Sequence, residues 1–147
     1  MRWQRAVLGG ILLSTAVAAG LPPYRMEMTP EEGPVDPVVA ARYTPALKVC
    51  QARAATTDDN ARCFAAEYGR QDAVLNAAWK RAYGRQPASR KVALLADQRR
   101  WIAARDPFCR KVEAGFAGGT IMALIWFDCR AEQAIRRTLW LEQLAGG

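Results

Sequence analysis

The amino-acid sequence predicts an all-α fold, a compact bundle of about four helices arranged as two hairpins and stapled by two disulfides. Three observations predict this fold. Apolar residues recur at helical spacing over most of residues 44–144, two short turn-like runs interrupt that pattern, and four cysteines lie symmetrically about those runs. We find no internal repeat that would suggest a solenoid.

The four cysteines form two candidate pairs, Cys50 with Cys63 and Cys109 with Cys129. The midpoint of the first pair falls in the polar run 56–60, and the midpoint of the second falls in the glycine-containing run 118–120. Residues equally distant from the turn of a helical hairpin face each other, so two hairpins would bring these pairs together. The sequence therefore favours these pairs among the three connectivities that four cysteines allow, although spacing alone proves none of them.

Two helices are predicted in the first hairpin. The first spans about residues 44–53, because Thr44 followed by Pro45 is typical of an N-cap and a first helical position. The second spans about residues 59–83, with Gly84 as its C-cap. Five of its residues recur close to the helical period and predict a buried stripe: Phe64, Tyr68, Leu75, Trp79 and Ala82.

The third helix begins near Pro87 or Ser89. Four of its apolar residues form pairs seven positions apart and predict one buried face: Leu94, Leu95, Trp101 and Ile102. Pro107 should kink or interrupt this helix, because proline lacks the backbone N–H that the helical ladder needs. The stretch through Cys109 and Val112 is expected to resume as helix.

The fourth helix is predicted from Thr120, as N-cap, to about Leu144. Its opening run 121–127 is apolar on all sides. Such a run predicts burial, and the alternatives are a surface for a partner or a patch that faces a membrane.

The N-terminal region resembles an export signal. Residues 1–19 have a basic start, an apolar stretch that glycines interrupt, and small residues at 17–19 that suit a signal peptidase. The stretch is too short and too rich in glycine for a good membrane span, so we expect cleavage and no stable span afterwards. The expected organisation is a signal peptide at 1–19, a proline-rich solvated linker at 20–42 and a helical domain at 43–147, with order beginning near Arg42. The expected location is the periplasm or the exterior, where disulfides persist.

Composition excludes several functions. The chain of 147 residues carries a formal net charge of +7 and contains no histidine. The absence of histidine excludes Ser-His and Cys-His catalysis, and it makes a common zinc site improbable because the cysteines also lack a Cys-x-x-Cys pair. We expect no catalytic residues, no metal and no cofactor. Positive charge favours anionic partners, but export and the lack of a binding motif argue against nucleic acid.

Several polar residues fall where the helical period predicts core. On the third helix Gln98 and Arg105 share a face with Trp101, and on the second helix Asp72 and Asn76 border the facing stripe. We predict an ion pair between Asp72 and Arg105, with Asn76 and Gln98 completing a hydrogen-bonded cluster. Unpaired burial of such groups would cost about 1 to 3 kcal/mol each. The functional alternative is that this cluster lines a binding cleft.

An ordered set of motifs then resembles a known family. The set comprises Cys50, Cys63, the run 72–76 (Asp-Ala-Val-Leu-Asn), the run 98–106 (Gln-Arg-Arg-Trp-Ile-Ala-Ala-Arg-Asp), Cys109, the run 118–120, Cys129, and Arg137 through Leu141. Together these resemble the LprI-like lysozyme inhibitor family of small exported bacterial domains, over about residues 46–144. The resemblance implies a helical, disulfide-linked fold and a lysozyme-type glycosidase as partner. The chain departs from the family pattern at Pro107 and at Trp79, where tyrosine is common.

Three functions follow as hypotheses. The first is a non-catalytic binding protein that blocks a cell-wall muramidase, although many lysozymes are basic and would repel a positively charged chain at long range. The second is a module that binds an anionic envelope polymer or a membrane surface through basic residues: Arg99, Arg100, Arg110, Lys111, Arg136 and Arg137. The third is a glycosidase that uses two carboxylates among Glu67, Asp72, Glu113 and Glu132, but no spacing selects two of them.

Overall fold

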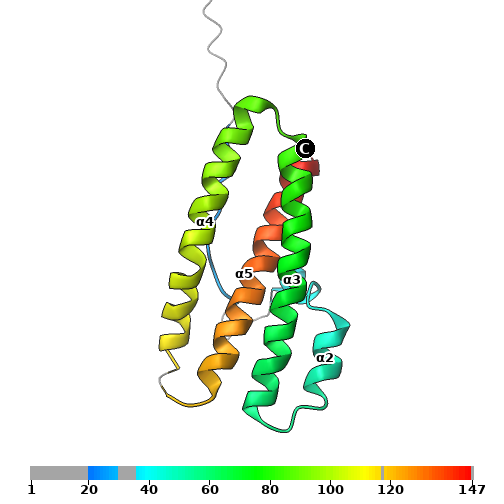
Figure 1. Ribbon diagram of the computed structural model, residues 1–147, viewed down its shortest axis with the longest axis vertical. Helices are drawn as coiled ribbons and strands as arrows, with labels where there is room; N and C mark the ends of the chain where they lie inside the picture. The colour runs from blue at the N-terminus through cyan, green and yellow to red at the C-terminus, as the bar shows by residue number, and fades with distance from the viewer. Residues whose placement is uncertain (1–19, 30–35, 117, 147) are drawn as a thin grey trace, which may run out of the picture.

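The protein is a bundle of long helices in two hairpins (Figure 1). A computed structural model describes residues 20–29, 36–116 and 118–146. Within those ranges all regular structure is helical: α1 (Pro37–Ala40), α2 (Pro45–Gln51), α3 (Thr57–Arg85), α4 (Ala88–Ala114) and α5 (Ile121–Gly146). The predicted all-α fold is confirmed. No helix in the described ranges has both the length and the apolar composition that a membrane crossing requires.

Both predicted disulfides are present. Cys50 of α2 is bonded to Cys63 of α3, and Cys109 of α4 is bonded to Cys129 of α5. Each bond joins the two arms of one hairpin, as the symmetry of the cysteines about the turns predicts.

A capping box and two glycines define the helix boundaries at the two turns. At the start of α3, Thr56 and Asp59 form a capping box in which each side chain accepts a hydrogen bond from the other's backbone N–H. Between α4 and α5, Gly118 and Gly119 have φ angles of 96° and 92°, in the left-handed region that glycine adopts without strain. These residues allow the chain to reverse within a few positions.

The core is centred on α5. This helix packs along α3 on one side and along α4 on the other, whereas α3 and α4 contact each other little (Figure 1). The central cluster combines large and small side chains: Leu75, Ala78, Ala82, Leu94, Trp101, Ala134, Trp140 and Leu141. The alanines let α3 and α5 approach closely, and the large residues of α4 and α5 fill the space beside them.

Some predicted details of α3 and α4 are wrong. Gly84 lies inside α3, which ends one residue later because Pro87 disfavours helical backbone at Gln86, whose backbone is extended. The Arg85 and Gln86 side chains donate to backbone carbonyls at the end of α5. Ile102 is 51% exposed, whereas Trp101 is 4% exposed, so the two do not share the buried face. Residues one position apart on a helix point about 100° apart, and only Trp101 faces α5.

The predicted buried stripe of α3 and the continuation of α4 are largely correct. Leu75 and Ala82 are buried, and Phe64, Tyr68 and Trp79 are half-buried. Helix α4 continues through Pro107 without a break to Ala114.

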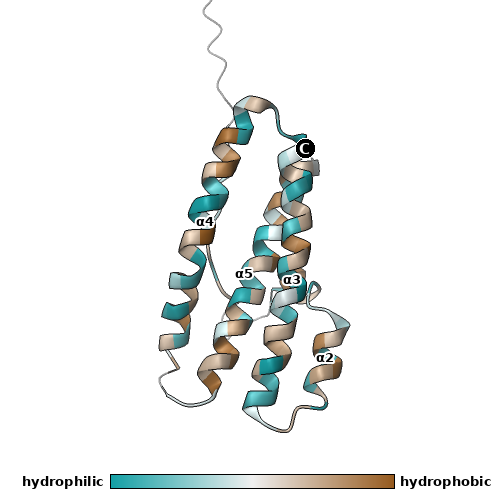
Figure 2. Ribbon diagram, viewed as in Figure 1, coloured by the Kyte–Doolittle hydropathy of each residue, from teal (hydrophilic) through white to brown (hydrophobic). Residues whose placement is uncertain are grey.

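The opening turns of α5 are less buried than expected. Ile121 is 41% exposed and Trp126 is half-buried, and Figure 2 shows the hydrophobic colour at this end of the helix. Full burial of α5 begins only at Cys129.

Residues 20–29, here called the N-terminal strap, lie along the bundle in Figure 1 as the blue trace between α4 and α5. The Trp140 indole N–H donates to the Pro22 carbonyl at 3.3 Å, and Gln133 donates to the Glu27 carbonyl at 2.7 Å. The expectation of a solvated linker is therefore wrong for the strap. Its backbone carbonyls find donors on α5, which composition alone does not reveal.

Order also begins before Arg42. Helix α1 precedes it, with Asp36 as its N-cap and Pro37 at its first position. The boundaries proposed for the signal peptide and for the helical domain stay predictions, and residues 1–19 lie outside the described part of the chain.

Candidate functional site

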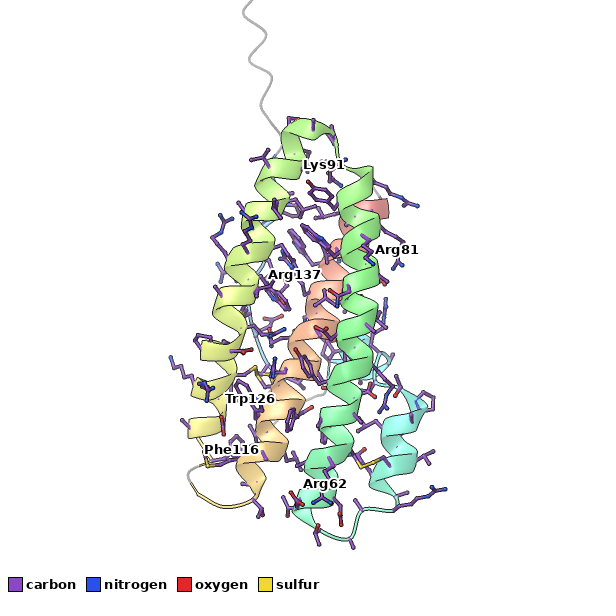
Figure 3. The ribbon with its side chains drawn as sticks, in the orientation of Figure 1. Arg62, Arg81, Lys91, Phe116, Trp126 and Arg137 are labelled. Atoms are coloured by element: carbon purple, nitrogen blue, oxygen red, sulfur yellow. A yellow bond between two sulfur atoms is a disulfide. The ribbon has the colours of Figure 1, made fainter. Side chains whose placement is uncertain are left out.

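A mostly apolar groove of about 630 Å³ lies on the α1, α2 and α5 side of the bundle. A volume of this size is typical of sites that bind small molecules or short segments of a partner. Every helix and the N-terminal strap contribute side chains to the groove. Its described lining comprises Met28, Thr29, Val39, Ala40, Tyr43, Leu47, Lys48, Gln51, Phe64, Val112, Phe116, Ile125, Asp128 and Glu132. Figure 3 labels Phe116, which lies at the end of the bundle where α4 ends.

A buried carboxylate holds one side of the groove in place. Glu67 of α3 is fully buried and accepts hydrogen bonds from the Thr44 backbone N–H (2.9 Å), the Thr44 hydroxyl (2.5 Å), Arg70 (2.9 Å) and Gln71 (2.8 Å). Burial alone would raise the pKa of Glu67, but these hydrogen bonds together hold that pKa below its usual range. The network attaches the start of α2, and therefore Tyr43, to α3.

Asp128 is the second carboxylate and lines the groove itself. The Tyr43 hydroxyl donates to its Oδ1 at 2.9 Å. Burial raises the pKa of Asp128 to about 6; the hydrogen bond from Tyr43 opposes this rise and the nearby Glu132 carboxylate adds to it. Burial and the Asp128 charge also raise the pKa of Tyr43, so its hydroxyl stays a donor.

The third carboxylate of this region, Glu132, is already hydrogen-bonded to other residues of the fold. Its Oε1 accepts from the Thr29 backbone N–H (2.7 Å), the Thr29 hydroxyl (2.9 Å) and Arg136 (2.8 Å). Arg136 also contacts Glu27 and Asp36. Glu132 therefore has a cation beside it. In the described ranges, no basic side chain lies within ion-pairing distance of Asp128.

The structure does not bring the predicted polar cluster together. Asp72 accepts a hydrogen bond from Asn76 at 3.1 Å on an exposed part of α3. Arg105 pairs instead with its neighbour Asp106, with 2.9 Å between Nε and Oδ1. The predicted ion pair between Asp72 and Arg105 is therefore wrong, because α3 and α4 are too far apart along this stretch to join these two residues.

Gln98, the remaining member of the predicted cluster, lies elsewhere, together with Trp101, which shares its helix face. Gln98 and Trp101 face α5, and Gln98 accepts a hydrogen bond from Arg137 Nε at 2.9 Å. Arg137 is fully buried and also donates to Asp97 at 2.7 Å. Its guanidinium carbon lies 4.1 Å from the centre of the Trp140 ring. Figure 3 shows the Arg137 side chain directed toward α4.

The sequence analysis placed Arg137 among the basic residues of a candidate polymer-binding or membrane-binding surface, and its burial shows that this placement is wrong. The signal that could have found its burial is spacing, because Arg137 follows Cys129 by two helical repeats of four residues through Gln133. All three side chains are buried. The same reasoning places Asp128 and Glu132 on the groove side, three and seven residues after Ile125.

Arginines stacked on aromatic rings fill the space between α3 and α4. The Arg105 guanidinium lies 5.6 Å from the Tyr68 ring and 5.5 Å from the Trp101 ring. The Arg130 guanidinium lies 4.2 Å from Tyr68 and 5.1 Å from Trp126, which Figure 3 shows on the side of α5 toward α4. These cation–π contacts join two helices that contact each other little directly. We interpret the stack as structural.

The chemistry of the described side chains gives no metal site. In residues 20–29, 36–116 and 118–146, no three Cys, Asp or Glu side chains gather closely enough to hold a metal ion.

A family model described as lysozyme inhibitor LprI matches residues 50–141. This match covers more than half of the chain. The chain belongs to the LprI family of lysozyme inhibitors. Searches of curated proteins and of solved structures found no match.

The LprI match includes both disulfides, α3, α4 and most of α5. It does not include the N-terminal strap, α1 or the first residues of α2. The groove is therefore lined by residues from inside and from outside the LprI-matched region. Asp128, Glu132 and Phe64 belong to the LprI-matched region, whereas Tyr43 and Leu47 come from the preceding segment.

Proposed function

We propose that this LprI-family protein is exported and acts as a non-catalytic inhibitor that binds and blocks a cell-wall muramidase. The observation that carries the proposal is the family match, which begins at the first cysteine and spans the whole stapled frame. The signal-like residues 1–19 and the two disulfides support an exported location.

The engagement of two of the four candidate carboxylates, Glu67 and Glu132, supports the non-catalytic part of the proposal. Glu67 accepts four hydrogen bonds within the fold, and Glu132 is bound to Thr29 and Arg136. A glycosidase needs two carboxyl groups that face a substrate from a defined separation. Here both groups serve the fold instead.

Several exposed basic residues favour a second candidate function, binding of an anionic envelope polymer. Arg99, Arg100, Arg110 and Lys111 are exposed on α4. Two of the residues first assigned to this surface do not contribute, because Arg137 is buried and Arg136 is bound to three acidic residues. The basic surface is therefore smaller than the sequence suggests.

The proposed function is tested by measuring cell-wall lysis by several classes of lysozyme, with and without purified, oxidised residues 20–147. The expected result is inhibition of at least one class at near-stoichiometric ratios that persists at moderate salt. A folded protein that inhibits no class would contradict the proposal. Binding to anionic polymer that disappears at moderate salt would support the second candidate.

A further inference from the structure

The apolar groove contains a carboxylate, Asp128, that forms no ion pair with any basic side chain of the described residues. Three charged residues line the described groove: Lys48, Asp128 and Glu132. Arg136 neutralises Glu132 at 2.8 Å, and Lys48 is exposed on α2, where water and salt screen its charge. Among the described residues, Asp128 accepts one side-chain hydrogen bond, from Tyr43. Its carboxylate is half-buried, and partial removal of a charge from water is costly unless a cation or several donors accompany it.

The walls beside Asp128 suit a cation that carries an apolar stem. The Tyr43 and Phe64 rings meet edge to face, with centroids 6.5 Å apart, and both line the groove. Aromatic faces attract cations, and the leucine and isoleucine side chains of the lining offer surface to methylene groups. A lysine or arginine side chain has this combination of an apolar stem and a charged end.

We propose that the groove is the partner-binding site, and that it receives a basic side chain of the lysozyme whose charged end pairs with Asp128 and whose stem packs on Tyr43 and Phe64. This inference rests on the proposed function and names the surface that performs it. It also explains how a positively charged chain binds a basic enzyme, because the contact places the partner's cation at a local acidic point.

The first test uses a matched pair of small probes and does not require lysozyme. 4-Phenylbutylamine carries an ammonium group at neutral pH, whereas 4-phenylbutan-1-ol has the same stem without the charge. We expect both to shift the NMR methyl signals of Leu47, Val112 and Ile125, with the amine binding about tenfold more tightly. Asp128→Asn should abolish this preference, and Asp72→Asn, the same change outside the groove, should preserve it. Equal affinities in the wild-type protein, or a preference that survives in Asp128→Asn, would overturn the inference.

The second test measures lysozyme inhibition by the same variants. We expect Asp128→Asn to weaken inhibition about tenfold or more, and Asp72→Asn to leave it unchanged. Normal inhibition by Asp128→Asn would overturn the groove as the contact while the proposed function would stand. A wild-type protein that prefers the amine but inhibits no lysozyme would instead overturn the proposed function and, with it, the identity of the partner.

Discussion

Asp128 shows at the scale of a single residue how a binding feature can oppose stability. Its carboxylate is half-buried near Glu132, with one hydrogen bond from Tyr43, and the loss of water around it raises its pKa to about 6. The charged form is therefore unfavourable in the folded protein at neutral pH. Binding sites commonly keep such groups because a ligand, and not the fold, supplies the missing partner.

We predict that Asp128→Asn stabilises the protein by about 1 to 2 kcal/mol at pH 7.5, because it removes the buried charge while the amide oxygen still accepts from Tyr43. The pKa of Asp128 is higher in the folded protein than in the unfolded chain, so the folded state binds more protons between about pH 4 and pH 6. Its contribution to stability therefore falls as pH rises through this range, and the gain from Asp128→Asn should be absent near pH 4.

Urea denaturation at pH 4 and pH 7.5 measures this effect, with Asp72→Asn as the control for loss of one negative charge. The titratable groups beside Asp128 are Tyr43 from the α1–α2 turn and Glu132 from α5, and the exposed Lys48 of α2 lines the same groove. A variant that is less stable than the wild type at pH 7.5 would contradict the account given for Asp128.

Arg137 supports the fold at the same scale. Its guanidinium joins Asp97 and Gln98 of α4 to the Trp140 ring of α5. Burial lowers the pKa of Arg137 and the hydrogen bond to Asp97 opposes this shift. The arginine stays charged because its ordinary pKa is so high.

We predict that Arg137→Met lowers the free energy of unfolding by about 3 to 5 kcal/mol, because it leaves Gln98 and Asp97 without their buried donor. Arg99→Met changes an exposed arginine of α4 and should alter stability by less than about 0.5 kcal/mol. Thermal or urea denaturation of the two variants makes the comparison. Equal effects would mean that Arg137 carries no special structural role.

At the scale of elements, α5 is the helix against which both α3 and α4 pack. Helices α3 and α4 each pack on α5 but contact each other little, so α4 is attached on one side only. Arginine and aromatic side chains bridge the remaining space through Arg105, Tyr68 and Arg130. The Cys109–Cys129 disulfide therefore holds the long helix α4 in place, whereas the Cys50–Cys63 disulfide attaches only the short α2.

We predict that replacing Cys109 and Cys129 with alanine lowers stability by about 3 kcal/mol or more, as a disulfide that closes a loop of this length implies. Replacing Cys50 and Cys63 should have a smaller effect, because the Glu67 network still attaches α2. Denaturation measures both, and hydrogen exchange should show faster opening of the last turns of α4 in the first variant alone. A larger loss from the second variant would contradict this ranking.

At the scale of the whole molecule, net charge and local charge act in opposite directions. The chain without residues 1–19 is still net positive, while the groove presents Asp128 to a partner. Long-range repulsion from a basic lysozyme governs the encounter, and the local contact governs how long the complex lasts.

We predict that the association rate with a basic lysozyme rises with salt, because salt screens the repulsion between two positively charged proteins. Binding to an anionic polymer should show the opposite salt dependence. Stopped-flow or surface-based kinetics between low and moderate ionic strength separate the two. An association rate that falls steeply with salt would indicate that attraction to a negatively charged surface drives binding.

Features that depend on residues close together in the sequence were predicted correctly, and features that depend on distant residues were not. The helices and both disulfides were predictable because helical period, turn residues and the symmetry of Cys50, Cys63, Cys109 and Cys129 are properties of neighbouring positions. The polar cluster was predicted from facing stripes, and its Asp72–Arg105 pair was wrong. The pairing of facing side chains depends on the distance between helices, which no period encodes.

The helical class, the two hairpins and their disulfides follow from local sequence patterns, which also carry the motifs of the LprI family. The burial of Arg137, the contact of the N-terminal strap with α5, and the position of Asp128 in an apolar groove, with no ion pair among the described residues, became visible in the folded structure. The reason is physical. Helix formation depends on residues within a few positions of each other, whereas burial and the pairing of charges depend on which distant segments a folded chain brings together.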